Sequence, residues 1–396
     1  MPALYVHVPF CEKKCVYCDF YSIETETRYD DFVALLVREI ELRAAWERQQ
    51  HPGATDDAAA HIGAARQDTP SAPHCTSIFF GGGTPSLLSP QQLGSILAAL
   101  RSHFPVTHDA EITVECNPGT VTNDKLAGYR ALGVNRLSFG VQSFHDDDLR
   151  FLSRIHTARE AEDGIALAHA AGFENVNLDL MFSLPGQTPE RWMYNLERAR
   201  ALGTTHLSCY SLTVERGTPL AGMVDRGEVR VTGEESDALL FEITMDTLGA
   251  WGFRHYEVSN YALPGYECLH NLAYWRHDQY YGFGPSAHGA LRDRREWNAR
   301  SLAAWSEALR RGTLPVAGGE HLDASILRSE YVYLRLRSEG IDLAEFHTRF
   351  GCDFLADNSP AAQRLLDEGL LQIIDGRISL TRKGFLVCDE ISASVG

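Results

Sequence analysis

The sequence predicts an α/β fold: a partial (β/α)6 barrel followed by a small, mainly helical, winged-helix-like C-terminal domain. Six short, apolar, β-branched runs alternate with amphipathic helical stretches, which is typical of parallel strands joined by right-handed crossovers. This alternation stops after Asn298, where three helices and a hairpin are expected instead. With 396 residues, 44% of them hydrophobic, the chain is long enough for one large and one small unit. We therefore expect residues 1–298 to form the barrel and residues 299–396 the second domain.

Local signals at the helix ends support the barrel. Ser89-Pro90 predicts a helix start, with the serine as N-cap and the proline in the first turn. Thr122 and Thr188 predict two further N-caps, and Gly133 and Gly203 predict the ends of the same two helices. The strands between the helices are expected at residues 4–8, 77–80, 111–115, 136–141, 175–182 and 206–211.

Two segments differ from this alternation. Residues 49–74 have no periodicity and little apolar bulk, so we expect a flexible insertion after a first helix at about 30–48. Near the C-terminus, helices are expected at 325–338, 343–349 and 360–368, followed by a hairpin that turns at Asp375-Gly376. Residues 320–396 contain 8 Lys and Arg against 13 Asp and Glu. This acidic balance favours a structural or lid role over DNA binding.

The composition argues against several classes of protein. A formal net charge of −17 argues against general nucleic-acid binding, which needs a basic surface. The N-terminus has no signal-peptide pattern, and no run of about 18 apolar residues predicts a membrane span. Nine cysteines, an odd number and mostly scattered, argue against a disulfide framework. We expect a soluble protein of the reducing cytoplasm.

The most informative motif is a cysteine triplet near the start of the chain, Cys11-x3-Cys15-x2-Cys18. Three thiolates at this spacing can hold a cubane [4Fe–4S] cluster and leave its fourth iron without a protein ligand. Zinc usually takes four ligands in paired groups, and no second pair follows here. A zinc site and three unrelated buried thiols remain the alternatives.

The triplet resembles the signature of the radical S-adenosylmethionine (SAM) superfamily. In that superfamily SAM chelates the open iron, and one electron from the cluster cleaves its sulfonium to give a 5′-deoxyadenosyl radical. The expected strand ends fit this chemistry, because barrel enzymes carry their sites there. The resemblance implies that the run Gly81-Gly82-Gly83 meets the amino and carboxylate groups of SAM, and that acidic or amide side chains meet its ribose.

Four ordered motifs narrow the resemblance to the oxygen-independent coproporphyrinogen III oxidase group. They are Tyr5-x-His7-x-Pro9-Phe10-Cys11, the run from Phe80 to Ser86, and residues 137–144 and 177–187. The resemblance covers nearly the whole chain. It implies SAM contacts for Tyr5, Tyr17, Gly82, Gly83, Thr84, Glu115, Gln142, Arg154 and Asp179, with Thr213 and His288 near further contact positions.

Two departures point to the haem-chaperone branch of this group. The oxidases carry a fourth cysteine where this chain has Phe20. This chain also carries the motif His270-Asn271-x2-Tyr274-Trp275. The oxidases have a different sequence in this segment, and there it helps to hold a second SAM. By this resemblance, the combination of the two features implies a chaperone that binds haem and hands it to respiratory haem proteins.

Histidines and free thiols supply the candidate haem ligands. His270 is one, with Tyr274 and Trp275 as an aromatic wall; the alternative is a buried, hydrogen-bonded histidine in a structural turn. His288, in a glycine-rich aromatic loop over residues 280–289, is a rival contact for haem or SAM. The thiols of Cys209 and Cys268 are further candidates, although lone cysteines are more often buried apolar groups.

Three hypotheses follow. The first is a haem chaperone that binds haem and a SAM-coordinated [4Fe–4S] cluster, and delivers haem to respiratory proteins, including acceptors at the membrane surface. The second is a radical SAM enzyme, either the oxygen-independent coproporphyrinogen III dehydrogenase or another porphyrin-modifying enzyme; Phe20 makes the oxidase activity doubtful. The third is a redox- or SAM-sensing regulator. The sequence leaves the oligomeric state open, a homodimer included.

Overall fold

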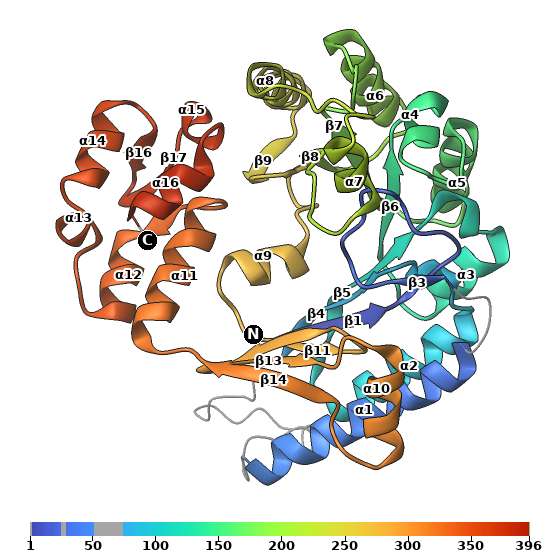
Figure 1. The fold of residues 1–396 in the computed structure, drawn as a ribbon. Helices are drawn as coiled ribbons and strands as arrows, with labels where there is room; N and C mark the ends of the chain where they lie inside the picture. The colour runs from blue at the N-terminus through green and yellow to red at the C-terminus, as the bar shows by residue number, and fades with distance from the viewer. Residues whose placement is uncertain (1, 25–28, 51–73, 396) are drawn as a thin grey trace.

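The computed structural model describes residues 2–24, 29–50 and 74–395 (Figure 1). Almost all of the insertion expected at residues 49–74 lies outside these ranges. Its first two residues end helix α1 (Tyr29–Gln50), which begins and ends close to the helix expected at 30–48. No helix in the described ranges is both long and apolar enough to cross a membrane.

One sheet of twelve strands forms the frame of the molecule. The six expected strands lie side by side in chain order and are all parallel, as predicted. They are β1 (Ala3–Val8), β4 (Cys75–Gly82), β5 (Val106–Cys116), β6 (Arg136–Gln142), β7 (Asn175–Phe182) and β8 (His206–Ser211). Their carboxyl ends therefore lie at one edge of the sheet.

Further strands extend both sides of this parallel core. Beyond β8 lie β10 (Asn260–Ala262) and β9 (Arg254–Glu257). On the other side β11 (Tyr280–Phe283) pairs parallel with β1, and β12 (His288–Leu291), β13 (Arg294–Asn298) and β14 (Val316–His321) follow it. The strand order runs from β14 to β9 without closure, so the barrel is open. The loop expected at residues 280–289 is instead β11 and the start of β12.

Helices lie around the outside of the parallel strands (Figure 1). Ser89, Thr122 and Thr188 are the N-caps of α2, α3 and α6, as expected. Gly133 and Gly203 follow α3 and α6 with positive φ angles. The larger-unit helices after α1 are α2 (Pro90–His103), α3 (Asn123–Ala131), α4 (Asp146–Phe151), α5 (Ala158–Ala170), α6 (Pro189–Ala201), α7 (Pro219–Asp225), α8 (Glu234–Ala250), α9 (Leu269–Trp275) and α10 (Leu302–Arg310).

A buried carboxyl joins α1 to the segment after β11. Glu39 accepts hydrogen bonds from the Gly284 amide and the Trp305 indole, both at 2.9 Å, and from the Asn298 amide at 2.5 Å. Burial raises the pKa of Glu39 to about 7, and these three donors oppose the rise. Trp305, on α10, is fully buried in the core of the large unit. Residues 299–321 therefore pack with the sheet.

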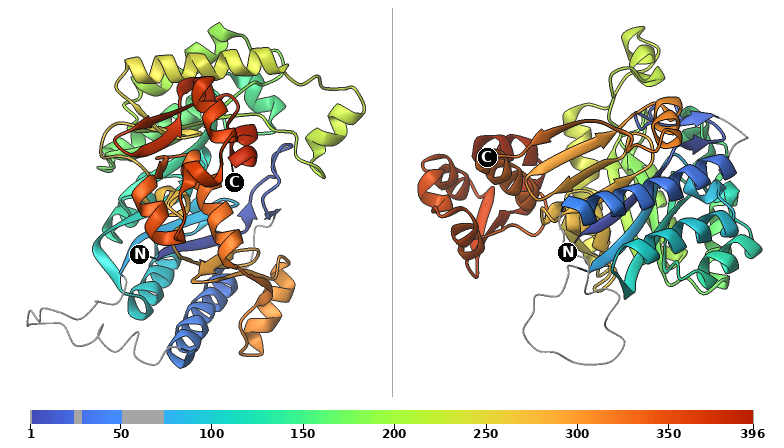
Figure 2. Two further views of the ribbon diagram at one scale, coloured as in Figure 1. Left: turned by 90° about the vertical axis from the view of Figure 1, so that its left-hand side faces the viewer. Right: turned by 90° about the horizontal axis from the view of Figure 1, so that it is seen from below.

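The C-terminal unit has its own core and forms a lobe beside the sheet (Figure 2). Its helices are α11 (Ala324–Leu336), α12 (Leu343–Phe350), α13 (Phe354–Asp357), α14 (Ala361–Asp367), α15 (Arg382–Phe385) and α16 (Cys388–Val395), with strands β15 (Ile341–Asp342), β16 (Leu371–Ile374) and β17 (Arg377–Leu380). The expected hairpin is β16–β17, and Asp375 and Gly376 both have positive φ in its turn. Because residues 299–321 belong with the sheet, we propose the division into two units near Leu322 instead of Asn298.

Candidate cofactor and ligand site

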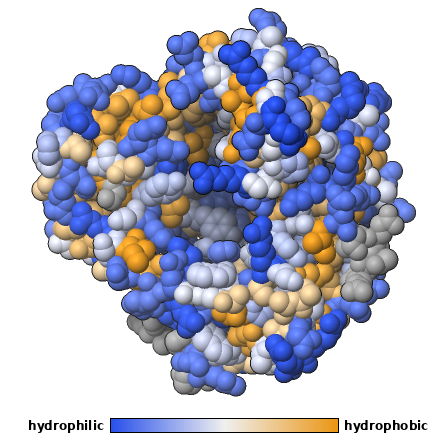
Figure 3. Space-filling view, in the orientation of Figure 1, coloured by the Kyte–Doolittle hydropathy of each residue, from blue (hydrophilic) through white to orange (hydrophobic). Residues whose placement is uncertain are grey.

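The parallel strands enclose a cavity of about 490 Å³, here called the cluster cavity. The loop after β1 contributes Tyr17, Cys18, Asp19 and Phe20 to its lining. Strands β4 to β8, the loop after β8, the start of β10 and Asn271 on α9 contribute its other walls. The surface is deeply hollowed near the centre of the face shown in Figure 3. Of the expected SAM contacts, Tyr17, Glu115, Asp179 and Thr213 line this cavity.

The cysteine triplet lies on the loop that follows β1, and all three thiols are half-buried. Thr84 donates a hydrogen bond to Cys11 Sγ at 3.6 Å, and Arg154 donates one to Cys15 Sγ at 3.5 Å. Among the described residues, no three His, Cys, Asp or Glu side chains converge as ligands of one metal ion. A cubane cluster does not need such convergence, because each thiolate binds a different iron. The three thiols lie near enough to interact electrostatically with one another, as a shared cluster requires.

Arg154 connects the triplet to the strand ends. Its guanidinium is buried and donates to Cys15 Sγ, to the Gly140 carbonyl at 2.5 Å and to Asn117 Oδ1. These three acceptors lie on the triplet loop, on β6 and just after β5. Arg154 thus holds the loop against two strands.

The glycine run at the end of β4 allows two strands to approach closely. Gly82 has a φ of +111°, and a Cβ there would lie 2.6 Å from the His7 ring. A Cβ on Gly83 would lie 2.5 Å from the Phe10 carbonyl oxygen. The Gly82 amide donates to Glu115 Oε2 at 3.1 Å. A side chain at Gly82 would collide with His7 on β1, and one at Gly83 would collide with the backbone that leads into the cysteine triplet.

Two buried carboxyls, Glu115 and Asp179, line the cluster cavity. Burial and then the negative charge of Asp179 raise the pKa of Glu115 to about 8, while the Gly82 amide and Arg136 oppose the rise. Burial also raises the pKa of Asp179, against hydrogen bonds from Asn177 and Ser208. Such acceptors suit ribose hydroxyls and an ammonium group. Arg136, 2% exposed, also lines the cavity and forms no ion pair with a described residue.

Gln142 ends β6 in a left-handed conformation, with a φ of 69°. Its side-chain oxygen accepts a hydrogen bond from the Tyr210 hydroxyl at 2.7 Å. A non-glycine residue in this conformation needs support from its surroundings. The loop that follows supplies that support.

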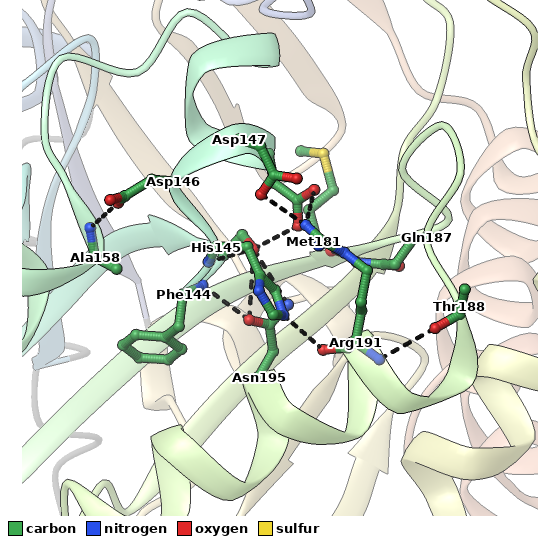
Figure 4. Close-up of polar contacts among 12 residues, drawn as sticks. Phe144, His145, Asp146, Asp147, Ala158, Met181, Gln187, Thr188, Arg191 and Asn195 are labelled. Carbon is green, nitrogen blue, oxygen red and sulfur yellow. Dashed lines mark hydrogen bonds and ion pairs between the residues drawn. The ribbon is translucent and has the colours of Figure 1, made fainter.

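A polar network holds this loop against α6 (Figure 4). Asn195 Oδ1 accepts from the Phe144 amide at 2.8 Å, and Ser143 Oγ donates to Asp148 Oδ2 at 2.7 Å. Arg191 forms ion pairs with Asp147 and Asp148 at 2.7 and 2.9 Å. The network fixes the backbone directly after Gln142, and Asn195 at its centre is fully buried.

Replacing Asn195 by alanine is expected to lower the free energy of unfolding by about 2–3 kcal/mol, because the buried Phe144 amide loses its acceptor. Urea unfolding followed by circular dichroism would measure the change. The matched control is Glu197→Ala, an exposed position on the same helix, which should change stability by less than about 0.5 kcal/mol. Equal effects in the two variants would contradict a structural role for the network.

A second cavity of about 400 Å³ adjoins the first and is here called the tyrosine cavity. Asp19 and Phe20 line both cavities, and Phe20 is 71% exposed. The remaining lining residues are Tyr5, His7, Tyr21, Tyr274, Tyr280, Ser286, His288 and Arg300. Tyr5, Tyr274 and His288 were expected at a ligand, and Tyr280 belongs to the aromatic segment expected there, whereas Tyr21 and Arg300 were not predicted. Tyr5, expected at SAM, lines this second cavity.

His270 lies behind the wall of the tyrosine cavity, 1% exposed. Its Nδ1 and Nε2 are bonded to the hydroxyls of Ser77 and Tyr274, each at 3.0 Å. Burial and then the charge of Arg136 lower the pKa of His270 to about 3. His270 therefore has the geometry of a buried, hydrogen-bonded structural histidine, which was the alternative to a haem ligand. Neither ring nitrogen is free to bind iron in this arrangement.

The other expected haem contacts are placed as follows. His288 is exposed and lines the tyrosine cavity. Cys209 and Cys268 are buried small side chains, and burial raises the pKa of the Cys268 thiol to about 12. Trp275 is half-buried at the end of α9. Of the aromatic pair in the His-Asn-x2-Tyr-Trp motif, Tyr274 is the one that lines the tyrosine cavity.

Comparisons with known proteins agree with this geometry. Residues 5–199 match the Radical SAM superfamily, and residues 326–387 match the HemN C-terminal domain. The chain is 36% identical over 393 residues to the heme chaperone HemW of Mycobacterium tuberculosis, covering 98% of this chain and 93% of that protein. It is 32% identical over 395 residues to the heme chaperone HemW of Bacillus subtilis, covering 99% of this chain and 98% of that protein.

A solved structure shares the fold. The coproporphyrinogen III oxidase HemN of Escherichia coli superimposes with a TM-score of 0.80 at 24% identity, over 100% of this chain and 90% of its own. The heme chaperone HemW of the same organism is 39% identical over 293 residues, covering 73% of this chain and 70% of that protein. The chain therefore belongs to the radical SAM superfamily and, within it, to the HemW family.

Proposed function

We propose that this protein is a haem chaperone that binds haem beside a SAM-coordinated [4Fe–4S] cluster and delivers the haem to respiratory haem proteins. Its family relatives carry the name heme chaperone. The observation that carries the proposal here is the pair of adjoining cavities that meet at Phe20. The fourth cysteine of the oxidases is thus replaced by an exposed aromatic side chain between two ligand-sized spaces.

In this proposal Cys11, Cys15 and Cys18 hold the cluster, which with SAM would supply one-electron chemistry. Gly82, Gly83 and Thr84 shape the wall beside the triplet. Glu115 and Asp179 accept hydrogen bonds from SAM, Gln142 contributes its side-chain amide group, and Tyr17 covers the cofactor from the loop. Arg154 keeps the triplet in place.

The remaining parts of the proposal concern the surroundings of the protein. The cytoplasm is the proposed compartment, because the cluster and the free thiols need reducing conditions. Haem-accepting respiratory proteins, including those at the membrane surface, are the proposed partners, and nucleic acid is not. A homodimer is compatible with the proposal but is not required by it.

The test separates a chaperone from an oxidase. The cluster is reconstituted without oxygen, and the protein is incubated with coproporphyrinogen III, SAM and a reductant beside an authentic oxidase. We expect no protoporphyrinogen, and we expect about one haem per chain in a separate titration. Product formation would make this protein a porphyrin-modifying enzyme in spite of Phe20. Absence of haem binding would overturn the chaperone proposal.

A further inference from the structure

Three histidines lie in or behind the wall of the tyrosine cavity, and they differ in whether a ring nitrogen is free. Iron needs the lone pair of a neutral imidazole nitrogen. His7 uses both nitrogens, with the Tyr5 hydroxyl at 3.1 Å and the Tyr21 carbonyl at 2.8 Å. His270 uses both for hydroxyl partners, as described above. Ligation by either histidine would break hydrogen bonds that hold the cavity wall together.

His288 is different. It begins β12, is exposed, and makes no side-chain hydrogen bond to any residue in the described ranges. Partial burial and then the charge of Arg295 lower the pKa of His288 below its usual 6.5, against the opposing charge of Glu320. The neutral ring, with a free lone pair, is therefore the main form at neutral pH. Trp297 on the neighbouring strand lies behind it, with ring centroids 5.9 Å apart.

The other lining residues suit a flat aromatic ligand with acidic groups at one edge. Tyrosine rings and the exposed Phe20 offer apolar faces to a macrocycle. Arg300 lies on the rim, exposed and without an ion pair to the described part of the chain. A guanidinium in this position suits a carboxylate. Asp19 is the other formally charged residue of the lining, and it would repel a carboxylate.

We propose that the tyrosine cavity is the haem site, with a ring nitrogen of His288 as the iron ligand and Arg300 as the partner of a propionate. This inference rests on the proposed function and specifies where the cargo binds. Because Asp19 and Phe20 line both cavities, the haem would lie directly beside the cluster loop. His270 then has a positioning role, since it fixes Tyr274 in the cavity wall.

The test is an anaerobic titration of the cluster-loaded protein with haem, followed by absorption and electron paramagnetic resonance spectra. His288→Ala should weaken binding by roughly two orders of magnitude and remove the spectral signature of an imidazole ligand. Added free imidazole should restore that signature. The matched control His321→Ala changes another exposed histidine, at the end of β14, and should leave the spectrum unchanged.

A second arm tests Arg300 with haem dimethyl ester, in which both propionates are blocked. Arg300→Ala should weaken binding of haem roughly tenfold but leave binding of the ester unchanged. The control Arg310→Ala, also exposed, should affect neither ligand. This arm remains informative even if His288→Ala fails to fold, which the iron content of the reconstituted protein would reveal.

The outcomes separate this inference from the proposed function. If the unaltered protein binds no haem, the proposed function fails and the inference fails with it. If the protein binds haem and His288→Ala keeps both affinity and spectrum, the inference is overturned while the function stands. Loss of the imidazole signature in folded His270→Ala, but not in His288→Ala, would move the ligand to the His-Asn-x2-Tyr-Trp motif.

Discussion

Replacing Cys15 by serine is expected to remove the cluster while the protein remains folded. A serine hydroxyl is a poor iron ligand, and two remaining thiolates leave two irons of the cubane without protein ligands. The iron content after anaerobic reconstitution should fall from about four per chain to near zero. The loop itself should stay in place, because Arg154 keeps its bonds to Asn117 and Gly140. Iron and sulfide assays with circular dichroism would measure both effects.

The control for this prediction is Cys352→Ser. Cys352 is a half-buried free thiol between α12 and α13 in the C-terminal unit, so its loss should leave the iron content unchanged. A variant with Cys11, Cys15 and Cys18 all replaced by serine provides the strongest test. Full iron content in that protein would show that the triplet does not hold the cluster.

The parallel core of the fold could be predicted because its signals are local. The apolar runs predicted the six parallel strands. Ser89 shows why the helix starts could also be predicted from nearby residues. Its hydroxyl accepts from the Gln92 amide while the Gln92 side chain accepts from the Ser89 amide, a capping box contained in four residues. In contrast, β11 pairs with β1 across more than 270 residues of sequence, and no local pattern indicates that contact. The place of β11 in the sheet was therefore missed.

The candidate site was predictable to a similar degree. Glu115 and Asp179 were expected at the ends of the third and fifth strands, and the structure brings both into the cluster cavity. The sequence could not decide between His270 and His288. The hydroxyl that occupies His270 Nδ1 belongs to Ser77, 193 residues earlier in the chain. Whether a histidine can bind iron depends on such long-range partners, which become visible only in the folded structure.

SAM binding is expected to tighten as the pH rises towards 8, because Glu115 must ionise to pair with a cationic ligand. Burial and the charge of Asp179 hold the pKa of Glu115 at about 8, so its carboxyl is largely protonated below that pH. SAM carries a sulfonium and an ammonium, which favour the ionised form. Below the pKa, the affinity should change by up to about tenfold per pH unit. Calorimetry in two buffers of different ionisation enthalpy would measure the affinity and the released proton.

The control is Glu115→Gln, which keeps the hydrogen-bonding shape but cannot ionise. Any titration of SAM itself is common to both proteins, so the difference between their pH profiles isolates the carboxyl. Identical profiles would contradict the prediction. Because Asp179 interacts with Glu115, the measured midpoint belongs to the pair.

The raised pKa of Glu115 also determines how the stability of the SAM-free protein changes with pH. The folded-state pKa of Glu115 lies above its ordinary value of 4.5, so the folded protein binds the proton more tightly than the unfolded chain. The stabilisation that the folded protein gains from this protonated carboxyl is fully present below about pH 4.5 and is lost as the pH rises through about 8. Relative to Glu115→Gln, the unaltered protein should therefore melt at a progressively lower temperature over this interval. Bound SAM should reverse that trend, since it stabilises the ionised carboxyl that burial disfavours.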